Sequence, residues 1–67
     1  MIFSMRLKET RKLRNLTQKE LAYMLAGTPN KVASWEQGRT EPSLADIVKL
    51  CKLLDVTSDY LLGITEY

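Results

Sequence analysis

The chain has 67 residues, of which 45% are hydrophobic and 27% charged, and its formal net charge is +2 at pH 7. This length allows one small domain near the lower limit for an unassisted core, and the single cysteine excludes an internal disulfide, as expected in a reducing compartment. No apolar run approaches the roughly 18 residues of a membrane span, and the start MIFSMRLKE lacks the basic and apolar blocks of a secretory signal, so we expect a cytoplasmic protein with no membrane partner.

The first predicted element is a helix from about Ser4 to Arg14. One face of it carries four residues at helical spacing, Phe3, Leu7, Thr10 and Arg14. Asn15 suits the turn that follows this helix.

A second helix is predicted to begin after Thr17. Thr17 is a good N-cap, and Glu20 three residues later completes a capping box. An apolar stripe follows at helical spacing, Leu21, Ala22 and Leu25. Gly27 is predicted to end the helix because glycine takes the left-handed conformation without a steric cost.

A third helix is predicted to begin directly afterwards. Thr28 suits the N-cap and Pro29 the first helical position, where its missing N–H matters least. Val32 and Trp35 face inward, which favours a core role for Trp35 over a stacking role. The outward face carries Asn30, Ala33, Ser34 and Gln37. Gly38 ends this helix, so residues 17–38 form two short helices joined by a tight turn.

Two further helices are predicted in the second half of the chain. Ser43 with Asp46 forms a short version of the capping box. The buried stripe of this fourth helix is predicted to be Leu44, Ile47, Leu50, Cys51 and Leu54. Thr57 caps a short fifth helix that Gly63 ends, and residues 64–67 are expected to fray.

Several short pieces occur in a fixed order along the chain: Arg11, Leu16-Thr17-Gln18, Leu21-Ala22, Val32, Trp35-Glu36, Gly38, Glu41-Pro42-Ser43, Leu50 and Asp59-Tyr60-Leu61-Leu62-Gly63. In this order they resemble the phage-repressor type of helix-turn-helix domain, also called the xenobiotic-response-element family, from about Phe3 to Ile64. The resemblance implies an all-α fold. We expect one compact, five-helix, lambda-repressor-like domain over residues 1–67, with the helix-turn-helix at 17–38.

Two positions depart from the pattern of that family. The family usually has glycine at the end of helix two, one residue before Gly27, where this chain has Ala26. It also often begins helix three with a long polar residue that reads a base and hydrogen-bonds the glutamine at the position of Gln18. Pro29 occupies this position and can do neither, so we expect it to make only an apolar contact, for example with a thymine methyl group.

The resemblance implies that the third helix enters the DNA major groove. Asn30 has the amide that pairs bidentately with adenine, and Ser34 lies one turn further along the same face. Ala33 allows a close approach to the groove. The residues predicted to contact bases are Pro29, Asn30, Ala33 and Ser34.

Four residues around the helix-turn-helix are predicted to contact DNA phosphates. Gln18 begins the second helix, where its counterpart in the family binds a phosphate. Lys31 lies toward the groove wall, and Arg39 follows the third helix with Thr40 beside it. The alternative for Gln18 and for Arg39 is a solvated surface side chain, and the alternative for Lys31 is a base contact.

The resemblance also implies two structural roles. The positions of Arg11 and Glu36 form a salt bridge in the family, between helix one and helix three. Related domains dimerise through their C-terminal end, so we expect a homodimer interface that includes Val56, Tyr60 and Ile64. Such a dimer places two recognition helices about 34 Å apart on a palindromic operator. Fraying of the tail is the alternative for Ile64.

Charge is unevenly distributed along the chain. Residues 1–40 contain eight Lys or Arg and three Asp or Glu, a balance of +5, whereas residues 41–67 contain two Lys and five Asp or Glu, a balance of −3. The helix-turn-helix lies in the basic half, which suits a polyanion such as DNA. The alternative is chance in a small chain.

The sequence argues against an enzyme. It contains no histidine, which is the commonest general base, and Cys51 is expected to be a small buried hydrophobic residue. No Cys/His cluster suits zinc, and no glycine-rich loop suits a phosphate group. We expect no catalytic residue, metal, cofactor or small-molecule ligand.

The leading function is therefore sequence-specific binding of double-stranded DNA by a small bacterial or phage-encoded transcriptional regulator, a dimeric repressor. Two alternatives stay open. An antitoxin would bind its operator and also a toxin. The toxin would contact Tyr23 and Met24, or else the apolar patch near the C-terminus that includes Val56, Tyr60 and Ile64. A protein-binding module would keep the fold but have lost DNA binding.

Overall fold

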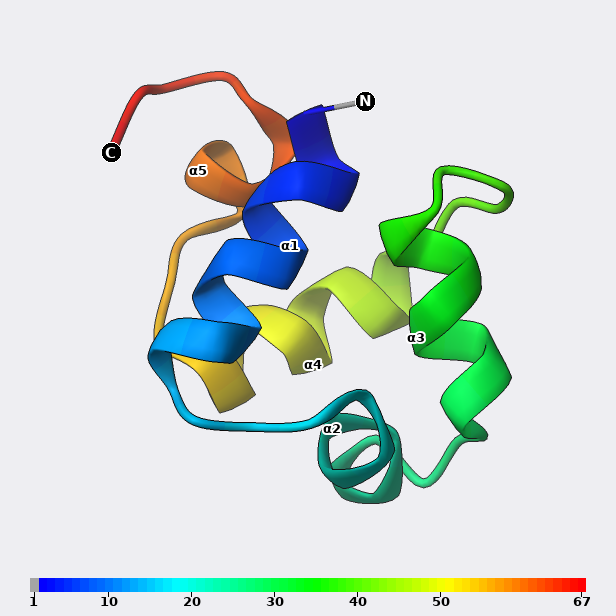
Figure 1. The fold of residues 1–67 in the computed structure, drawn as a ribbon. Helices are drawn as coiled ribbons and strands as arrows, with labels where there is room; N and C mark the ends of the chain where they lie inside the picture. The colour runs from blue at the N-terminus through cyan, green and yellow to red at the C-terminus, as the bar shows by residue number, and fades with distance from the viewer. Residues whose placement is uncertain (1) are drawn as a thin grey trace.

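The structure is a computed structural model and describes residues 2–67. Over this range the chain forms five helices and no strand: α1 (Ile2–Leu13), α2 (Gln18–Met24), α3 (Pro29–Glu36), α4 (Leu44–Leu54) and α5 (Ser58–Leu62). The predicted all-α, five-helix architecture is confirmed. Helix α2 packs against α3, both α3 and α5 pack against α1, and α4 packs against α5 (Figure 1).

Helix α1 begins two residues earlier than predicted and ends at Leu13. Its buried face consists of Phe3, Ser4, Leu7, Thr10 and Arg11. Arg14, which the sequence placed on this face, follows the helix and is exposed. Its Nε donates a hydrogen bond to the carbonyl oxygen of Leu54 at 2.9 Å, so Arg14 connects the end of α1 to the end of α4 and is not part of the core.

The predicted capping box begins α2. Thr17 Oγ1 accepts a hydrogen bond from the Glu20 amide at 3.0 Å, and Glu20 Oε1 accepts one from the Thr17 amide at 2.9 Å. The prediction that Gly27 ends α2 in the left-handed conformation is wrong. Ala26 takes that conformation, with φ 57°, and Gly27 does not. The turn therefore lies at the position where the family usually has glycine, but here with a methyl side chain.

Ala26→Gly is expected to stabilise the protein. The left-handed conformation costs an L-residue about 1–2 kcal/mol, and glycine removes this cost. The greater conformational freedom of glycine in the unfolded chain offsets about 0.4–1 kcal/mol of that gain in stability. We therefore expect the free energy of unfolding to rise by about 0.5–1 kcal/mol, measured by urea denaturation.

Gly27→Ala is the control for this substitution. A Cβ at Gly27 would lie 3.7 Å from the Cδ of Lys31, which is ordinary van der Waals contact, and the backbone there is not left-handed. The free energy of unfolding should stay unchanged or rise by up to about 1 kcal/mol. A clear loss of stability would instead identify Gly27 as the left-handed residue.

Helix α3 is fixed to its neighbours by its inward face. Thr28 is the N-cap residue and Pro29 follows at the start of the helix, as predicted, although the Thr28 side chain makes no capping hydrogen bond. Val32 and Trp35 are 0% and 1% exposed. Ser4 Oγ of α1 donates a hydrogen bond to the Trp35 carbonyl oxygen at 2.6 Å. The core role predicted for Trp35 is confirmed.

The caps predicted for α4 and α5 are present. Ser43 Oγ accepts a hydrogen bond from the Asp46 amide at 3.1 Å, and Thr57 Oγ1 accepts one from the Tyr60 amide at 3.1 Å. Gly63 ends α5 in the left-handed conformation, with φ 83°. Each of these helices therefore begins with a hydrogen bond that spans three residues.

One hydrophobic core draws residues from all five helices: Phe3, Leu7, Leu21, Ala22, Leu25, Val32, Trp35, Ile47, Leu50, Leu54 and Leu61. The prediction that Leu44 belongs to this core is wrong, because Leu44 lies on the side of α4 that carries Val48 and is 86% exposed. Cys51 is half-buried, and burial raises the pKa of its thiol. None of the helices within residues 2–67 is long and apolar enough to cross a membrane.

Arg6 of α1 holds the segment that follows α5. Its Nη1 donates hydrogen bonds to the carbonyl oxygens of Tyr60, at 2.6 Å, and Thr65. The guanidinium carbon lies 4.4 Å from the centroid of the Tyr60 ring, within the range of a cation–π contact. Thr65 belongs to the segment predicted to fray and is hydrogen-bonded to α1.

Candidate nucleic-acid interface

The outward side of α3 carries the residues predicted to contact bases. Pro29 and Asn30 are exposed, whereas Ala33 and Ser34 are half-buried. Asn30 points away from the buried side of the helix and is followed, one turn later, by these two short side chains. An amide that projects from the first turn of a helix beside small residues has the shape needed to reach a base edge.

A buried network fixes the orientation of α3. Arg11 Nε donates to Glu36 Oε2 at 2.7 Å and Arg11 Nη2 to Glu36 Oε1 at 3.1 Å. The two side chains are 9% and 3% exposed. Arg11 Nη1 also donates to the Leu16 carbonyl oxygen at 2.8 Å, in the loop that leads into α2. The ion pair expected for Arg11 and Glu36 is therefore present and connects α1 to the end of α3.

Gln18 extends the same network to α2. Its Nε2 donates a hydrogen bond to Glu36 Oε1 at 3.0 Å, and the residue is half-buried. This bond uses one of the two amide N–H groups, so the amide still has a donor for a phosphate oxygen. The sequence singled out Gln18 as a phosphate contact but missed its bond to Glu36, which joins residues 18 positions apart.

Lys31 is paired within the protein. Its Nζ lies 3.3 Å from Asp46 Oδ2 at the start of α4 and 5.6 Å from the centroid of the Trp35 ring. Burial disfavours the charged Asp46 carboxylate, but hydrogen bonds from Ser43 and Lys31, together with the positive charge of Lys31, outweigh burial and lower the pKa of Asp46. The sequence predicted Lys31 as a phosphate contact and missed this partner.

Arg39 and Thr40, the other two predicted phosphate contacts, lie in the loop between α3 and α4. Gly38 takes the left-handed conformation, with φ 75°, and so turns the chain out of α3. The Arg39 amide donates to the Ser34 carbonyl oxygen at 3.0 Å. Both side chains are exposed, so the loop presents a guanidinium and a hydroxyl group beside the outward side of α3.

An apolar groove of about 540 Å³ lies between α4 and α5. We call it the α4–α5 groove, and its lining residues are Leu44, Ile47, Val48, Cys51, Lys52, Val56, Thr57, Ser58 and Leu62. Of the three residues predicted at a dimer interface, Val56 lines it. Tyr60 lies under Arg6, and Ile64 is 69% exposed outside it. The sequence missed Leu44 and Val48, although their spacing of four places them on one helical face.

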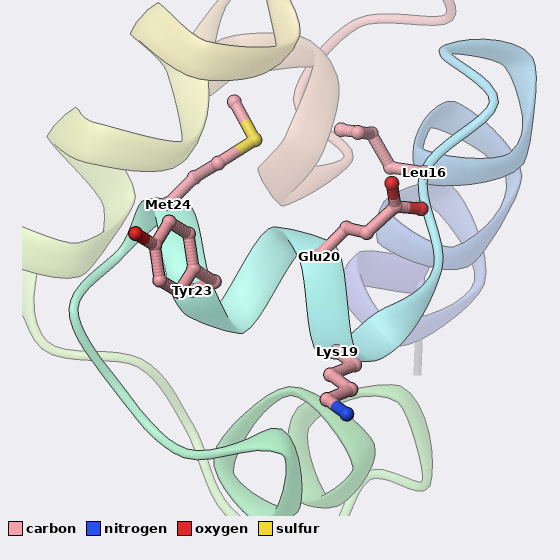
Figure 2. Close-up of a pocket in the computed structure, with 5 residues that line it drawn as sticks. All are labelled: Leu16, Lys19, Glu20, Tyr23 and Met24. Carbon is pink, nitrogen blue, oxygen red and sulfur yellow. The ribbon is translucent and has the colours of Figure 1, made fainter.

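A second apolar hollow, of about 360 Å³, lies on the outer face of α2 and includes the two residues considered as a partner patch. Leu16, Lys19, Glu20, Tyr23 and Met24 line it (Figure 2). Tyr23 is 86% exposed and Met24 44% exposed, and Lys19 points away from Glu20 and Met24 (Figure 2). Within the part of the chain that the structure describes, no three Asp, Glu, Cys or His residues gather as a metal site.

Comparison with known proteins gives a consistent picture. A family model described as helix-turn-helix matches residues 7–61. The uncharacterized HTH-type transcriptional regulator YqaE of Bacillus subtilis is 38% identical over 61 residues, which are 91% of this chain and 53% of that protein. The HTH-type transcriptional regulator ImmR of Bacillus subtilis is 39% identical over 61 residues, 91% of this chain and 48% of that protein. The chain thus spans about half the length of these relatives.

Two solved structures have the same fold. The P22 c2 repressor in complex with a synthetic operator superposes with a TM-score of 0.85 at 28% identity, covering 91% of this chain and 92% of that one. The restriction-modification controller protein C.AhdI from Aeromonas hydrophila has a TM-score of 0.81 at 34% identity, covering 88% of this chain and 89% of that one. The lambda-repressor-like arrangement expected from the sequence is confirmed.

Proposed function

Because the chain belongs to the helix-turn-helix family, we propose that it binds double-stranded DNA in the cytoplasm and regulates transcription, as a repressor that occupies a promoter and without enzymatic activity. The buried pair of Arg11 and Glu36 is the observation that supports this most directly. Together with Gln18, it fixes α3 against α1 and α2, while the Asn30 amide stays exposed on the outward side. A groove-reading helix needs this combination of a rigid back and a free polar front.

The proposed contacts divide into base reading and phosphate binding. Asn30 donates one hydrogen bond to adenine and accepts another from it. Ala33 and Pro29 provide close apolar contact, and Ser34 provides a hydroxyl group. Gln18, Arg39 and Thr40 bind phosphates on either side of α3 and so set its register on the duplex.

We propose that a second copy of the chain covers the α4–α5 groove. Leu44, Val48 and Leu62 are 86%, 53% and 50% exposed, which is unusual for apolar side chains gathered in one place on a small monomer. A two-fold dimer formed through this groove presents two α3 helices to one face of DNA, so the proposed operator is a palindrome.

Selection from random duplex DNA is expected to enrich one palindromic sequence with an A·T pair in each half-site. Asn30→Ala should weaken binding to that sequence by about 1–3 kcal/mol for each half-site and relax the preference at both A·T pairs, because one bidentate contact is lost in each half-site. Fluorescence anisotropy on the selected duplex and on a duplex with these pairs exchanged measures both effects. Equal losses on the two duplexes would contradict a base-reading role for Asn30.

Tyr23→Ala is the matched control, since Tyr23 is exposed on the outer face of α2. Its affinity for the selected duplex should equal that of the unaltered protein. The hollow around Tyr23 and Met24 also supports a second candidate function, an antitoxin or protein-binding module. If selection enriches no DNA sequence, the protein-binding module replaces the first function, because an antitoxin would also bind its operator.

A further inference from the structure

The two charged side chains of α3 are both paired with residues from other helices. Glu36 bonds to Arg11 of α1, and Lys31 to Asp46 of α4. The remaining polar groups on the outward side of α3, those of Asn30 and Ser34, are neutral. The helix proposed to enter the major groove therefore presents no unpaired charge to the DNA.

Asp46 is well placed to keep Lys31 paired. Its side chain is 13% exposed, and Oδ2 accepts a hydrogen bond from the Ser43 amide at 3.4 Å as part of the capping box. This hydrogen bond holds the carboxylate at the start of α4 independently of Lys31. The Lys31 ammonium also lies over the Trp35 ring, which has a fixed position in the core. Both partners thus draw the ammonium toward the protein.

We propose that Asp46 sets the DNA affinity of the protein without touching DNA: by pairing with Lys31 it removes one cation from the phosphate contacts of each protomer. The inference rests on the proposed DNA-binding function. A lysine–phosphate contact strengthens binding to every sequence alike, because phosphates carry no sequence information. Neutralising Lys31 therefore lowers affinity for specific and non-specific DNA by a similar factor and leaves base reading by Asn30 intact. This replaces the phosphate contact that the sequence predicted for Lys31.

The first test is the salt dependence of Lys31→Met, which removes the charge and keeps the apolar stem. On the selected duplex, the slope of log affinity against log salt should equal that of the unaltered protein. Arg39→Gln is the comparison, because loss of one phosphate contact from each protomer of the dimer reduces the magnitude of the slope by about 1.8. A reduction of about 1.8 in Lys31→Met as well would overturn the inference.

The second test is Asp46→Asn, which releases Lys31. The salt slope should become steeper by about 1.8, which is about 0.9 for each protomer of the dimer. Affinity for the selected duplex and for a scrambled duplex should rise by a similar, several-fold factor, because the added contact carries no sequence information. Ser43→Ala weakens the same cap but keeps the Lys31–Asp46 pair, and should leave the slope unchanged. Thermal melting followed by circular dichroism establishes that each variant is folded at the assay temperature.

The outcomes separate the two proposals. If the unaltered protein binds no duplex in a salt-dependent manner, the proposed function fails and the inference fails with it. If it binds a selected sequence but Asp46→Asn changes neither the salt slope nor the affinity for the two duplexes, only the inference is overturned.

Discussion

Arg11→Ala is expected to lower the free energy of unfolding by about 3–5 kcal/mol, because it leaves the Glu36 carboxylate buried without its cationic partner. Glu36 is 3% exposed, and Gln18 is then its one remaining side-chain donor among the described residues. A domain of this size has only a few kcal/mol of total stability. Urea denaturation at 25 °C, followed by circular dichroism, should therefore show a large unfolded fraction before any denaturant is added.

Arg14→Ala is the matched control, because Arg14 is also an arginine and follows the end of α1, close to Arg11 in the chain. Arg14 is exposed and donates to two carbonyl oxygens, those of Leu54 at 2.9 Å and Asp55 at 3.5 Å. Because these bonds lie at the surface and the second is long, the loss of Arg14 should cost only about 0.5–1.5 kcal/mol. The double variant Arg11→Met with Glu36→Leu removes both charges and should recover much of the lost stability. Equal losses in Arg11→Ala and Arg14→Ala would show that the buried pair does not stabilise the fold.

Val48→Asp is expected to abolish dimerisation and to reduce affinity for the palindromic duplex by about 10²–10⁴-fold. A carboxylate in the α4–α5 groove would have to lose its water when a second copy covers the groove. In the dimer, binding of one α3 to its half-site holds the second α3 close to the other half-site, at a high effective concentration. Without the dimer, this advantage is lost. Analytical ultracentrifugation measures the association, and anisotropy measures the affinity for DNA.

Leu13→Asp introduces the same charge at a side chain that is 76% exposed and outside the α4–α5 groove. This variant should associate as the unaltered protein does. Val48→Asp should also keep the helical circular dichroism spectrum, since Val48 is 53% exposed and not part of the core. A monomeric unaltered protein, or a dimeric Val48→Asp, would show that the groove is not the dimer interface.

Features that depend on near neighbours in the chain could be predicted from the sequence. The caps at Thr17, Ser43 and Thr57 are hydrogen bonds across three residues, so the residue types alone identify them. The order of motifs along the chain was enough to identify the family and the pairing of Arg11 with Glu36. It did not identify Gln18 as a third member of that network, because the contact depends on how closely α2 approaches α3.

The end of α2 shows where a local rule failed. Glycine is the default residue for the left-handed conformation, so the sequence favoured Gly27, yet Ala26 adopts it. Leu25 immediately before it is 8% exposed. The chain must turn directly after Leu25 enters the core, and this tertiary requirement outweighs the preference of the individual residue.

Five helices, the caps at Thr17, Ser43 and Thr57 and the outward position of Asn30 could be predicted from the sequence, because they follow from helical periodicity and short-range hydrogen bonds. The exposure of Leu44 in a surface groove and the pairing of Lys31 with Asp46, 15 residues away, depend on the tertiary fold. Periodicity fixes which residues of one helix share a face, but not how that helix is rotated against its neighbours. That rotation is set by the packing of the whole core, and it decides which outward charges are free to meet a partner.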